Sequence, residues 1–417
     1  MKNLAVRLHE KNKLSLDSFE LPKIRENEIL ACVVTDSLCM STYKALIQGK
    51  EHKRVPDNID TKPVIVGHEF CGEILEVGAV WQEKYRVGDK FVIQPALNYK
   101  GSLEAPGYSY QYIGGDSQYI VIPSEAMETD NLITYNSNCF YHGSLTEPMS
   151  CIIGAFNSSY HTKCGEYEHV MGTKPGGKML ILAGCGPMGI GAIDYALNGL
   201  EAPPSLLVVT DKDNDRINNA KLIFTDKHVT FLNDSDKNAL MELSGKEGYD
   251  DVFVFAPVPE LIELGGELLA NDGCLNFFAG PTNKDFTAKF NFYNVHYAKT
   301  HIVGTSGGNA HDMKMAIELM EKCKINPSVM ITHIGGLDSV VDATMNLPKI
   351  PGAKKLIYTD ISLPLTKITD FCKLAYLDNE NANLFKGLSE ICKENGDIWC
   401  SAAEEYLLKN AKRISAE

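Results

Sequence analysis

Three residues that lie far apart in the sequence have side chains of the kinds that bind zinc. They are Cys39, His68 in the tripeptide Gly67–Glu69, and Glu147 at the start of a Glu-Pro-Met-Ser-Cys segment. A catalytic zinc ion takes three protein ligands of these types and keeps a fourth position for water or substrate. Taken singly, Cys39 could be a core residue, His68 a hydrogen-bonded loop residue and Glu147 the first residue of a helix. As a set, they predict a catalytic zinc site.

A glycine-rich turn follows an apolar run and precedes an expected helix. It has the pattern Gly-x-Gly-x-x-Gly, in which the residues expected to contact a cofactor are Gly184, Gly186, Pro187, Met188 and Gly189. Glycines allow the tight turn and the close backbone approach of a bound group. The free N–H groups at the start of a helix attract phosphate. The turn therefore predicts a dinucleotide site.

An acidic residue follows this turn at the spacing typical of nucleotide-binding folds. Asp211 lies 22 residues beyond Gly189, at the end of the next apolar run, where it can accept hydrogen bonds from the adenosine ribose. A carboxylate there repels a 2′-phosphate, which favours NAD over NADP. Two basic neighbours, Lys212 and Arg216, weaken that preference, and Arg216 is itself a candidate cofactor contact.

The elements that must position these residues change in character along the chain. Up to about residue 150, short strands separated by Gly, Pro and Asn are expected at Glu28–Val34, Cys71–Val77 and Lys90–Ile93. From Gly177 onward, strands alternate with helical stretches and are expected at Lys178–Ala183, Leu206–Thr210, Asp251–Phe255, Cys274–Phe278 and His301–Val303. This alternation predicts an α/β fold with a parallel sheet. After the apolar run Lys355–Tyr358, helices are expected at Thr366–Leu377 and Ala402–Ala411.

The sequence Cys-x-Ser at Cys39–Ser41, the tripeptide Gly67–Glu69 and the glycine turn together resemble the zinc-containing medium-chain dehydrogenase/reductase family. The resemblance covers about residues 1 to 360. It implies a GroES-like β-barrel catalytic domain that carries zinc, a Rossmann doubly wound parallel sheet that carries the cofactor, and an active site between them. We expect the GroES-like domain at 1–152, the Rossmann domain at 153–303, a return to the catalytic domain at 304–360 and a helical C-terminal extension at 361–417.

The Glu-Pro segment at Glu147–Cys151 resembles the sorbitol dehydrogenase branch of that family, in which this glutamate supplies the third zinc ligand. Within the branch, the segments Tyr108–Tyr112 and Tyr167–Thr173 are most similar to the L-sorbose-1-phosphate reductases. The resemblance implies an oxidoreductase that moves a hydride between NAD(P)(H) and a secondary alcohol or ketone. Its substrate would be a polyol or sugar, with or without a phosphate, such as L-sorbose 1-phosphate reduced to glucitol 6-phosphate. A homodimer or homotetramer is expected.

The resemblance also assigns roles near the zinc site. Ser41 is the candidate for passing the hydroxyl proton toward solvent, with Thr42 in reserve; Thr42 stands where the family often has aspartate. Glu69 either coordinates transiently, acts electrostatically or pairs with a cation. If the substrate carries a phosphate, Lys44, Lys53 and Arg54 are the residues expected to neutralise it, unless they are ordinary solvated surface; candidate nicotinamide contacts are Gly280, Thr305 and Ser306.

Other features narrow the class of protein. A formal net charge of −14 argues against a nucleic-acid partner, and no apolar run is long enough to span a membrane. The N-terminal residues contain no continuous hydrophobic stretch and no cysteine pair has metal-binding spacing, so we expect a cytoplasmic protein with reduced thiols. Gln94–Gln118, where many relatives bind a structural zinc, has no cysteine, so one zinc per chain is expected. Two alternatives remain: a zinc-free reductase of the same fold, and a non-catalytic nucleotide-binding protein.

Overall fold

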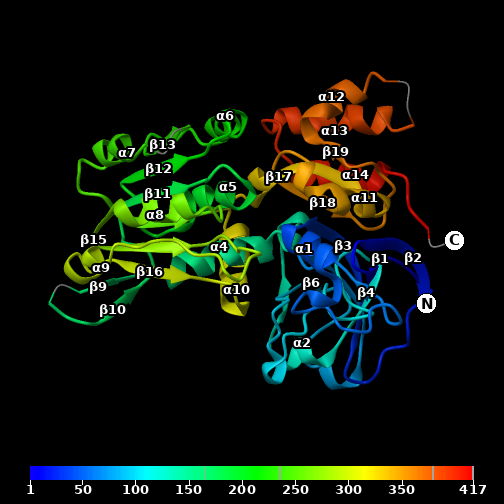
Figure 1. Ribbon diagram of the computed structural model, residues 1–417. Helices are drawn as coiled ribbons and strands as arrows, with labels where there is room; N and C mark the ends of the chain where they lie inside the picture. The colour runs from blue at the N-terminus through cyan, green and yellow to red at the C-terminus, as the bar shows by residue number, and fades with distance from the viewer. Residues whose placement is uncertain (164, 234–235, 378–379, 416–417) are drawn as a thin grey trace. The chain divides into compact units, whose positions relative to one another are not determined.

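The computed structural model describes residues 1–163, 165–233, 236–377 and 380–415. The chain divides into two compact units (Figure 1). The first comprises Met1–Glu147 and Pro327–Glu417, and the second comprises Pro148–Asn326. Within the described ranges, every helix falls short of the length and hydropathy that crossing a bilayer requires.

The first unit contains two sheets. The larger has the order β19-β17-β18-β3-β5-β6-β8, with β7 paired to β3, and the smaller has the order β2-β1-β4. The strands are β1 (Lys2–Glu10), β2 (Lys13–Glu20), β3 (Ile29–Leu38), β4 (Val64–Ile65), β5 (Phe70–Val77), β6 (Lys90–Ile93), β7 (Tyr119–Ile122), β8 (Leu132–Tyr135), β17 (Ile331–Gly336), β18 (Lys354–Tyr358) and β19 (Thr366–Lys367). This architecture confirms the GroES-like domain that the family resemblance implies.

Alternating burial along β3 shows why these residues form the core of the barrel. Ile29, Ala31 and Val33 are buried, while the residues between them are half-buried. Successive strand residues point to opposite faces, so these three side chains share one face of the sheet. They pack there with apolar residues of neighbouring strands, including Phe70 and Phe91.

The helices of the first unit lie between and after its strands. The α-helices are α1 (Met40–Gln48), α2 (Ser124–Glu128), α3 (Tyr141–Ser144), α11 (Val340–Asn346), α12 (Phe371–Leu374), α13 (Ala382–Glu394) and α14 (Ser401–Asn410). The short 3-10 turns are η1 (Gly49–Glu51), η2 (Ala79–Trp81), η3 (Tyr99–Gly101), η5 (Pro327–Met330), η6 (Leu337–Ser339), η7 (Leu347–Lys349) and η8 (Ile368–Asp370).

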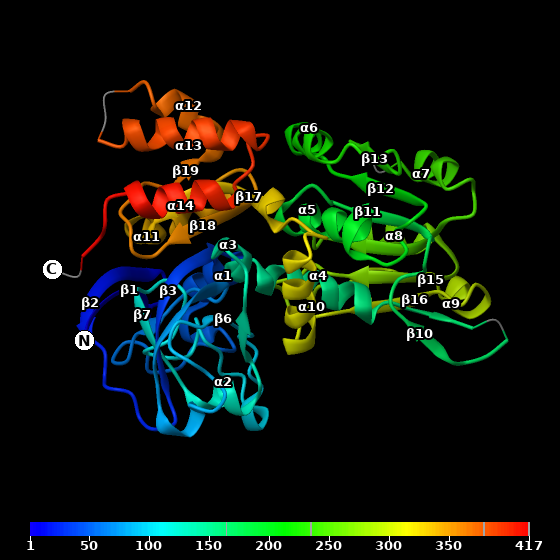
Figure 2. The same ribbon diagram turned by 180° about the vertical axis from the view of Figure 1, so that it is seen from behind.

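The C-terminal segment is part of this unit's core. Figure 2 shows α13 and α14 beside β17 and β18, and Trp399 and Leu388 are fully buried in a cluster that also contains Tyr358 of β18. The predicted helix at Ala402–Ala411 is confirmed by α14. The helix predicted from Thr366 is wrong in its first part, because Thr366 and the next residue form β19, which satisfies backbone groups along the edge of β17.

The second unit is built on a six-stranded parallel sheet with the order β13-β12-β11-β14-β15-β16. Its strands are β11 (Lys178–Leu182), β12 (Leu206–Thr210), β13 (Val229–Leu232), β14 (Tyr249–Val254), β15 (Leu269–Phe277) and β16 (His301–Gly304), and a separate hairpin pairs β9 (Tyr160–Thr162) with β10 (His169–Met171). Numbered within the sheet, this order is 3-2-1-4-5-6, the arrangement of the Rossmann fold.

Helices cover both faces of this sheet. They are α4 (Thr146–Ser158), α5 (Pro187–Asp194), α6 (Asn214–Ile223), α7 (Lys237–Leu243), α8 (Pro259–Glu267), α9 (Phe292–Tyr297) and α10 (Ala310–Glu321), with a π-helical turn η4 (Tyr195–Gly199) after α5. In β14, Val252 and Val254 pack with Ile262 of α8. The intervening Phe253 points the other way and stacks on Phe156 of α4, with ring centroids 4.3 Å apart.

Candidate active site

Cys39, His68 and Glu69 form a cluster in the first unit. One ligand atom from each residue lies within 4.8 Å of the others. Cys39 caps the N-terminus of α1, and its Sγ accepts a 3.5 Å hydrogen bond from the backbone N–H of Ser41. His68 and Glu69 directly precede β5, which pairs with β3. Two of the three predicted metal ligands are therefore brought together, and Glu69 lies with them.

His68 is buried in the neutral form that metal binding requires. Burial lowers its pKa to about 4. Its Nδ1 lies 3.3 Å from Oγ1 of Thr42, and its Nε2 lies 3.2 Å from the hydroxyl oxygen of Tyr108. These two contacts fix the orientation of the ring. Thr42, the reserve candidate for proton transfer, is thus placed against the imidazole.

Glu69 forms a buried ion pair with Lys354 of β18. The Lys354 ammonium donates to both carboxylate oxygens at 2.5 Å, and the hydroxyl of Ser37 donates to one of them. Burial lowers the pKa of Lys354, but the negative groups around it outweigh burial and raise the pKa above its usual value. The ammonium is therefore charged. This is the cation pairing considered for Glu69, although its carboxylate still belongs to the cluster.

Glu147 lies at the start of α4, close enough to act electrostatically on the cluster. Burial raises the pKa of Cys39 to about 12, and the charges of Glu69 and Glu147 contribute to that shift. Such surroundings disfavour a thiolate unless a further positive charge is present. The thiol of Cys39, the neutral imidazole of His68 and the carboxylates of Glu69 and Glu147 therefore make a donor set that fits a zinc ion.

A carboxylate from the C-terminal segment holds the chain that leads to Glu147. Glu404 of α14 is buried and accepts hydrogen bonds from the backbone N–H groups of Phe140 at 2.6 Å and Tyr141 at 3.0 Å. It also accepts one from the hydroxyl of Tyr358 at 2.7 Å. These bonds fix the start of α3, which directly precedes α4.

Sequence reasoning missed two residues of this site. Tyr108 is fully enclosed and contacts both His68 and the hydroxyl of Ser41, the predicted proton relay. Its only sequence signal is its place in a tyrosine-rich loop. Lys354 gives no local signal, because its partner Glu69 lies far away in the sequence and the pairing depends on the sheet.

The residues proposed to bind a substrate phosphate lie at different depths. Lys44 is half-buried in α1 and Lys53 is exposed. Arg54 is half-buried, and its guanidinium carbon lies 5.4 Å from the centroid of the Tyr108 ring.

The glycine turn joins β11 to α5 as predicted. Gly186 caps α5 and Pro187 occupies its first turn. A Cβ on Gly189 would lie 2.1 Å from the carbonyl oxygen of Gly184, so only glycine fits there. Asp211 follows β12, and its Oδ2 accepts a 3.1 Å hydrogen bond from the backbone N–H of Cys185. Its carboxylate therefore faces the turn.

The other cofactor candidates share the same edge of the sheet. Gly280 follows β15, and Thr305 and Ser306 follow β16. In an open parallel sheet, ligands bind at the carboxyl ends of the strands, which is this edge. Arg216 of α6 also reaches the turn. If Gly186 carried a Cβ atom, the nearest atom to it would be Nη1 of Arg216, at 3.9 Å.

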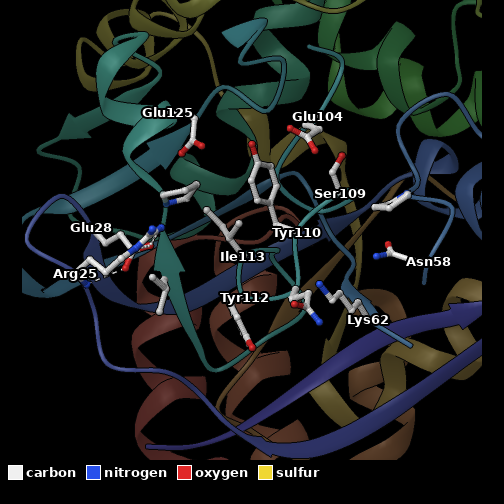
Figure 3. Close-up of a pocket in the computed structure, with 14 residues that line it drawn as sticks. Arg25, Glu28, Asn58, Lys62, Glu104, Ser109, Tyr110, Tyr112, Ile113 and Glu125 are labelled. Atoms are coloured by element: carbon white, nitrogen blue, oxygen red, sulfur yellow. Dashed lines mark hydrogen bonds and ion pairs between the residues drawn. The ribbon is translucent and has the colours of Figure 1, made fainter. Parts of the chain in front are cut away.

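A separate hollow of about 360 Å³ lies on the first unit (Figure 3). Arg25, Lys62, Tyr110 and Glu125 are among the residues that line it, and Arg25 forms an ion pair with Glu28 there. The lining residues include no member of the Cys39–His68–Glu69 cluster. The hollow is therefore distinct from the candidate metal site.

Comparison with known proteins assigns both units. The model of the alcohol dehydrogenase GroES-like domain matches residues 25–129, and the zinc-binding dehydrogenase model matches residues 187–322. The crystal structure of 2R,3R-butanediol dehydrogenase from Bacillus subtilis superposes with a TM-score of 0.71 at 21% identity, covering 86% of this chain and 100% of that one. That likeness establishes the fold.

Two curated relatives are similar over nearly their whole length. L-sorbose 1-phosphate reductase from Klebsiella pneumoniae is 47% identical, covering 99% of this chain and 98% of that protein. Mannitol-1-phosphate 5-dehydrogenase from Aliivibrio fischeri is 47% identical, covering 95% of each. Together with the two matched domains, these relatives show that the chain is an oxidoreductase of the zinc-binding alcohol dehydrogenase family.

Proposed function

We propose that this chain moves a hydride between NAD(H) and the secondary alcohol or ketone of a polyol or ketose phosphate. The observation that carries the proposal is the Cys39–His68–Glu69 cluster in a zinc-binding dehydrogenase. The two relatives at 47% identity, which are named for L-sorbose 1-phosphate and mannitol 1-phosphate, support a phosphorylated substrate. L-sorbose 1-phosphate, reduced to glucitol 6-phosphate, is the first substrate to test.

Cys39, His68 and Glu147 are the residues that we propose to hold zinc, with Glu69 as the neighbouring carboxylate. Bound there, the ion would supply Lewis-acid chemistry, which lowers the pKa of an alcohol. Glu69 lies in the cluster, and its position favours it as a ligand. However, Lys354 already binds both of its carboxylate oxygens and would compete with a metal ion for them. Glu147 is the second carboxylate whose charge acts on Cys39, and it is the ligand that the Glu-Pro segment implies.

Two hydroxyl side chains beside the cluster, those of Thr42 and Ser41, have separate proposed roles. Thr42 contacts Nδ1 of His68 and so orients the imidazole. Ser41 contacts the hydroxyl of Tyr108 and is half-buried, which leaves it suited to pass a proton from the substrate hydroxyl toward solvent. We therefore retain Ser41 as the relay residue.

For the cofactor, we propose NAD(H) in preference to NADP(H). The Asp211 carboxylate faces the glycine turn, where it would repel a 2′-phosphate. Arg216, which also reaches the turn, is the residue that opposes this preference. The ratio of kcat/KM for NADH to that for NADPH tests the assignment, and a ratio below one would overturn it.

The experiment that tests the function combines metal analysis with turnover. Purified protein is analysed for zinc and assayed for oxidation of NADH and NADPH on ketoses and their phosphates. We expect about one zinc per chain and oxidation that depends on a ketose phosphate. Folded protein that shows neither zinc nor turnover, even after zinc is added, would refute the proposal. Comparing the zinc content of Glu147→Gln and Glu69→Gln identifies the carboxylate ligand, which we expect to be Glu147.

A further inference from the structure

The segment between Cys39 and His68 brings a histidine and an arginine against Tyr108, the aromatic residue beside the Cys39–His68–Glu69 cluster. The ring of His52 stacks on that of Tyr108, with centroids 5.6 Å apart and planes inclined by 11°. The guanidinium carbon of Arg54 lies 5.4 Å from the centroid of the same ring. Tyr108 therefore carries a histidine and an arginine against its ring.

Tyr108 also connects these side chains to the candidate metal site. Its hydroxyl lies 3.2 Å from Nε2 of His68, and the two rings have centroids 4.9 Å apart. Arg54 and His52 are near enough to His68 for their charges to contribute to lowering its pKa, after burial and Lys354. A group bound by Arg54 would thus lie about one tyrosine ring from the cluster.

Among the residues that the structure describes, no acidic side chain forms an ion pair with this basic segment. None of the ion pairs formed by residues 1–163, 165–233, 236–377 and 380–415 involves His52, Lys53 or Arg54. The Nε of Arg54 is buried without a hydrogen-bond partner. A buried donor left without an acceptor is costly, so the site is poised for an anion.

His52 offers a second donor at the same place. Its Nδ1 lies 3.3 Å from the backbone nitrogen of Arg54, which can only donate, so Nδ1 accepts and the proton of the neutral ring is on Nε2. Burial and the charges of Arg54, Lys53 and Lys44 lower the pKa of His52 to about 4. The part of the shift that comes from these three charges reflects a positive local potential, which favours an anion.

We propose that Arg54 and His52 bind the phosphate group of the substrate whose alcohol or ketone is held at the Cys39–His68 cluster. The inference rests on the proposed function and extends it to the residues that select a phosphorylated substrate. The guanidinium presents two parallel N–H donors that match a phosphate, and His52 adds a third donor. Lys53 and Lys44 contribute charge without being required for contact.

The test compares a ketose phosphate with the same ketose lacking phosphate. L-sorbose 1-phosphate and L-sorbose are assayed with the zinc-loaded enzyme and with Arg54→Gln. Loss of a charge-assisted hydrogen bond should lower the ratio of the two kcat/KM values by about 10- to 150-fold. A purely structural defect would lower both values and leave the ratio unchanged. Arg86→Gln is the matched control, because Arg86 is exposed in the same unit and its loss removes the same charge.

Two further measurements keep the outcomes distinct. Arg54→Lys keeps the positive charge but lacks the planar guanidinium group, so it should restore part of the ratio of kcat/KM values. It replaces Arg54→Gln in the test if that variant does not fold. Titration calorimetry with inorganic phosphate should show weaker binding to Arg54→Gln than to Arg86→Gln. If the unaltered enzyme oxidises NADH with neither sugar, the proposed function fails. If it is active and the Arg54 variants keep the same ratio and the same phosphate affinity, the phosphate site is refuted.

Discussion

The buried pair of Glu69 and Lys354 provides a stringent test of the metal-site geometry. Their side chains are only 2% and 5% exposed, and the ammonium contacts both carboxylate oxygens. Lys354→Met leaves the carboxylate buried without its cation. Breaking such a pair costs about 3–5 kcal/mol, because desolvation of the remaining charge is no longer offset.

The cost can be measured as a shift in the thermal unfolding midpoint of the first unit. For a unit of this size, about 3–5 kcal/mol corresponds to a decrease of about 6–20 °C. The measurement is made on zinc-free protein, so that loss of metal does not contribute. The double variant Glu69→Gln/Lys354→Met removes both charges and should recover most of the loss. A single variant that unfolds within about 2 °C of the unaltered protein would show that the pair is solvated and the reasoning wrong.

Three other predictions concern the C-terminal segment, the cofactor turn and the hairpin of the second unit. Glu404→Ala should destabilise the first unit by about 2–4 kcal/mol in urea unfolding, because it leaves one buried and one partly buried N–H group without an acceptor; Glu404→Gln should cost less. Gly189→Ala should weaken NADH binding by about tenfold or more in a fluorescence titration, since its Cβ would overlap the carbonyl of Gly184, and unchanged affinity would contradict the packing. Burial lowers the pKa of His161, but its interactions with Asp251 and Asp272 together outweigh burial and raise the pKa above 6.5. The stability that this pair contributes should be fully present below about pH 6.5 and lost as the pH rises through the raised pKa. The difference in thermal unfolding midpoint between the unaltered protein and His161→Gln should therefore shrink with rising pH.

Local patterns predicted the elements of both units well. Lys90–Ile93 and Leu206–Thr210 form strands with the predicted bounds, because their apolar residues and flanking turns leave little choice. The glycine pattern also predicted the turn between β11 and α5, since its spacing follows from the backbone geometry of such a turn. These features depend on neighbouring residues in the chain.

Features that depend on contacts between residues far apart in the sequence could not be predicted from the sequence. The strand at Thr366 forms because it pairs with the edge of β17. Lys354 reaches Glu69 of the candidate metal cluster because β18 pairs with β3. Likewise, nothing near Glu404 in the sequence indicates that its carboxylate will bind the start of α3. Long-range pairing of buried charges is set by the completed fold and leaves no local pattern.

We expect one zinc ion to be bound through the thiolate of Cys39 together with nitrogen and oxygen ligands. X-ray absorption at the zinc edge of the purified enzyme measures this directly. We expect one sulfur at about 2.3 Å, with the remaining ligands at about 2.0–2.2 Å, and loss of the sulfur signal in Cys39→Ser. A zinc ion with no sulfur ligand, or with several, would contradict the assignment.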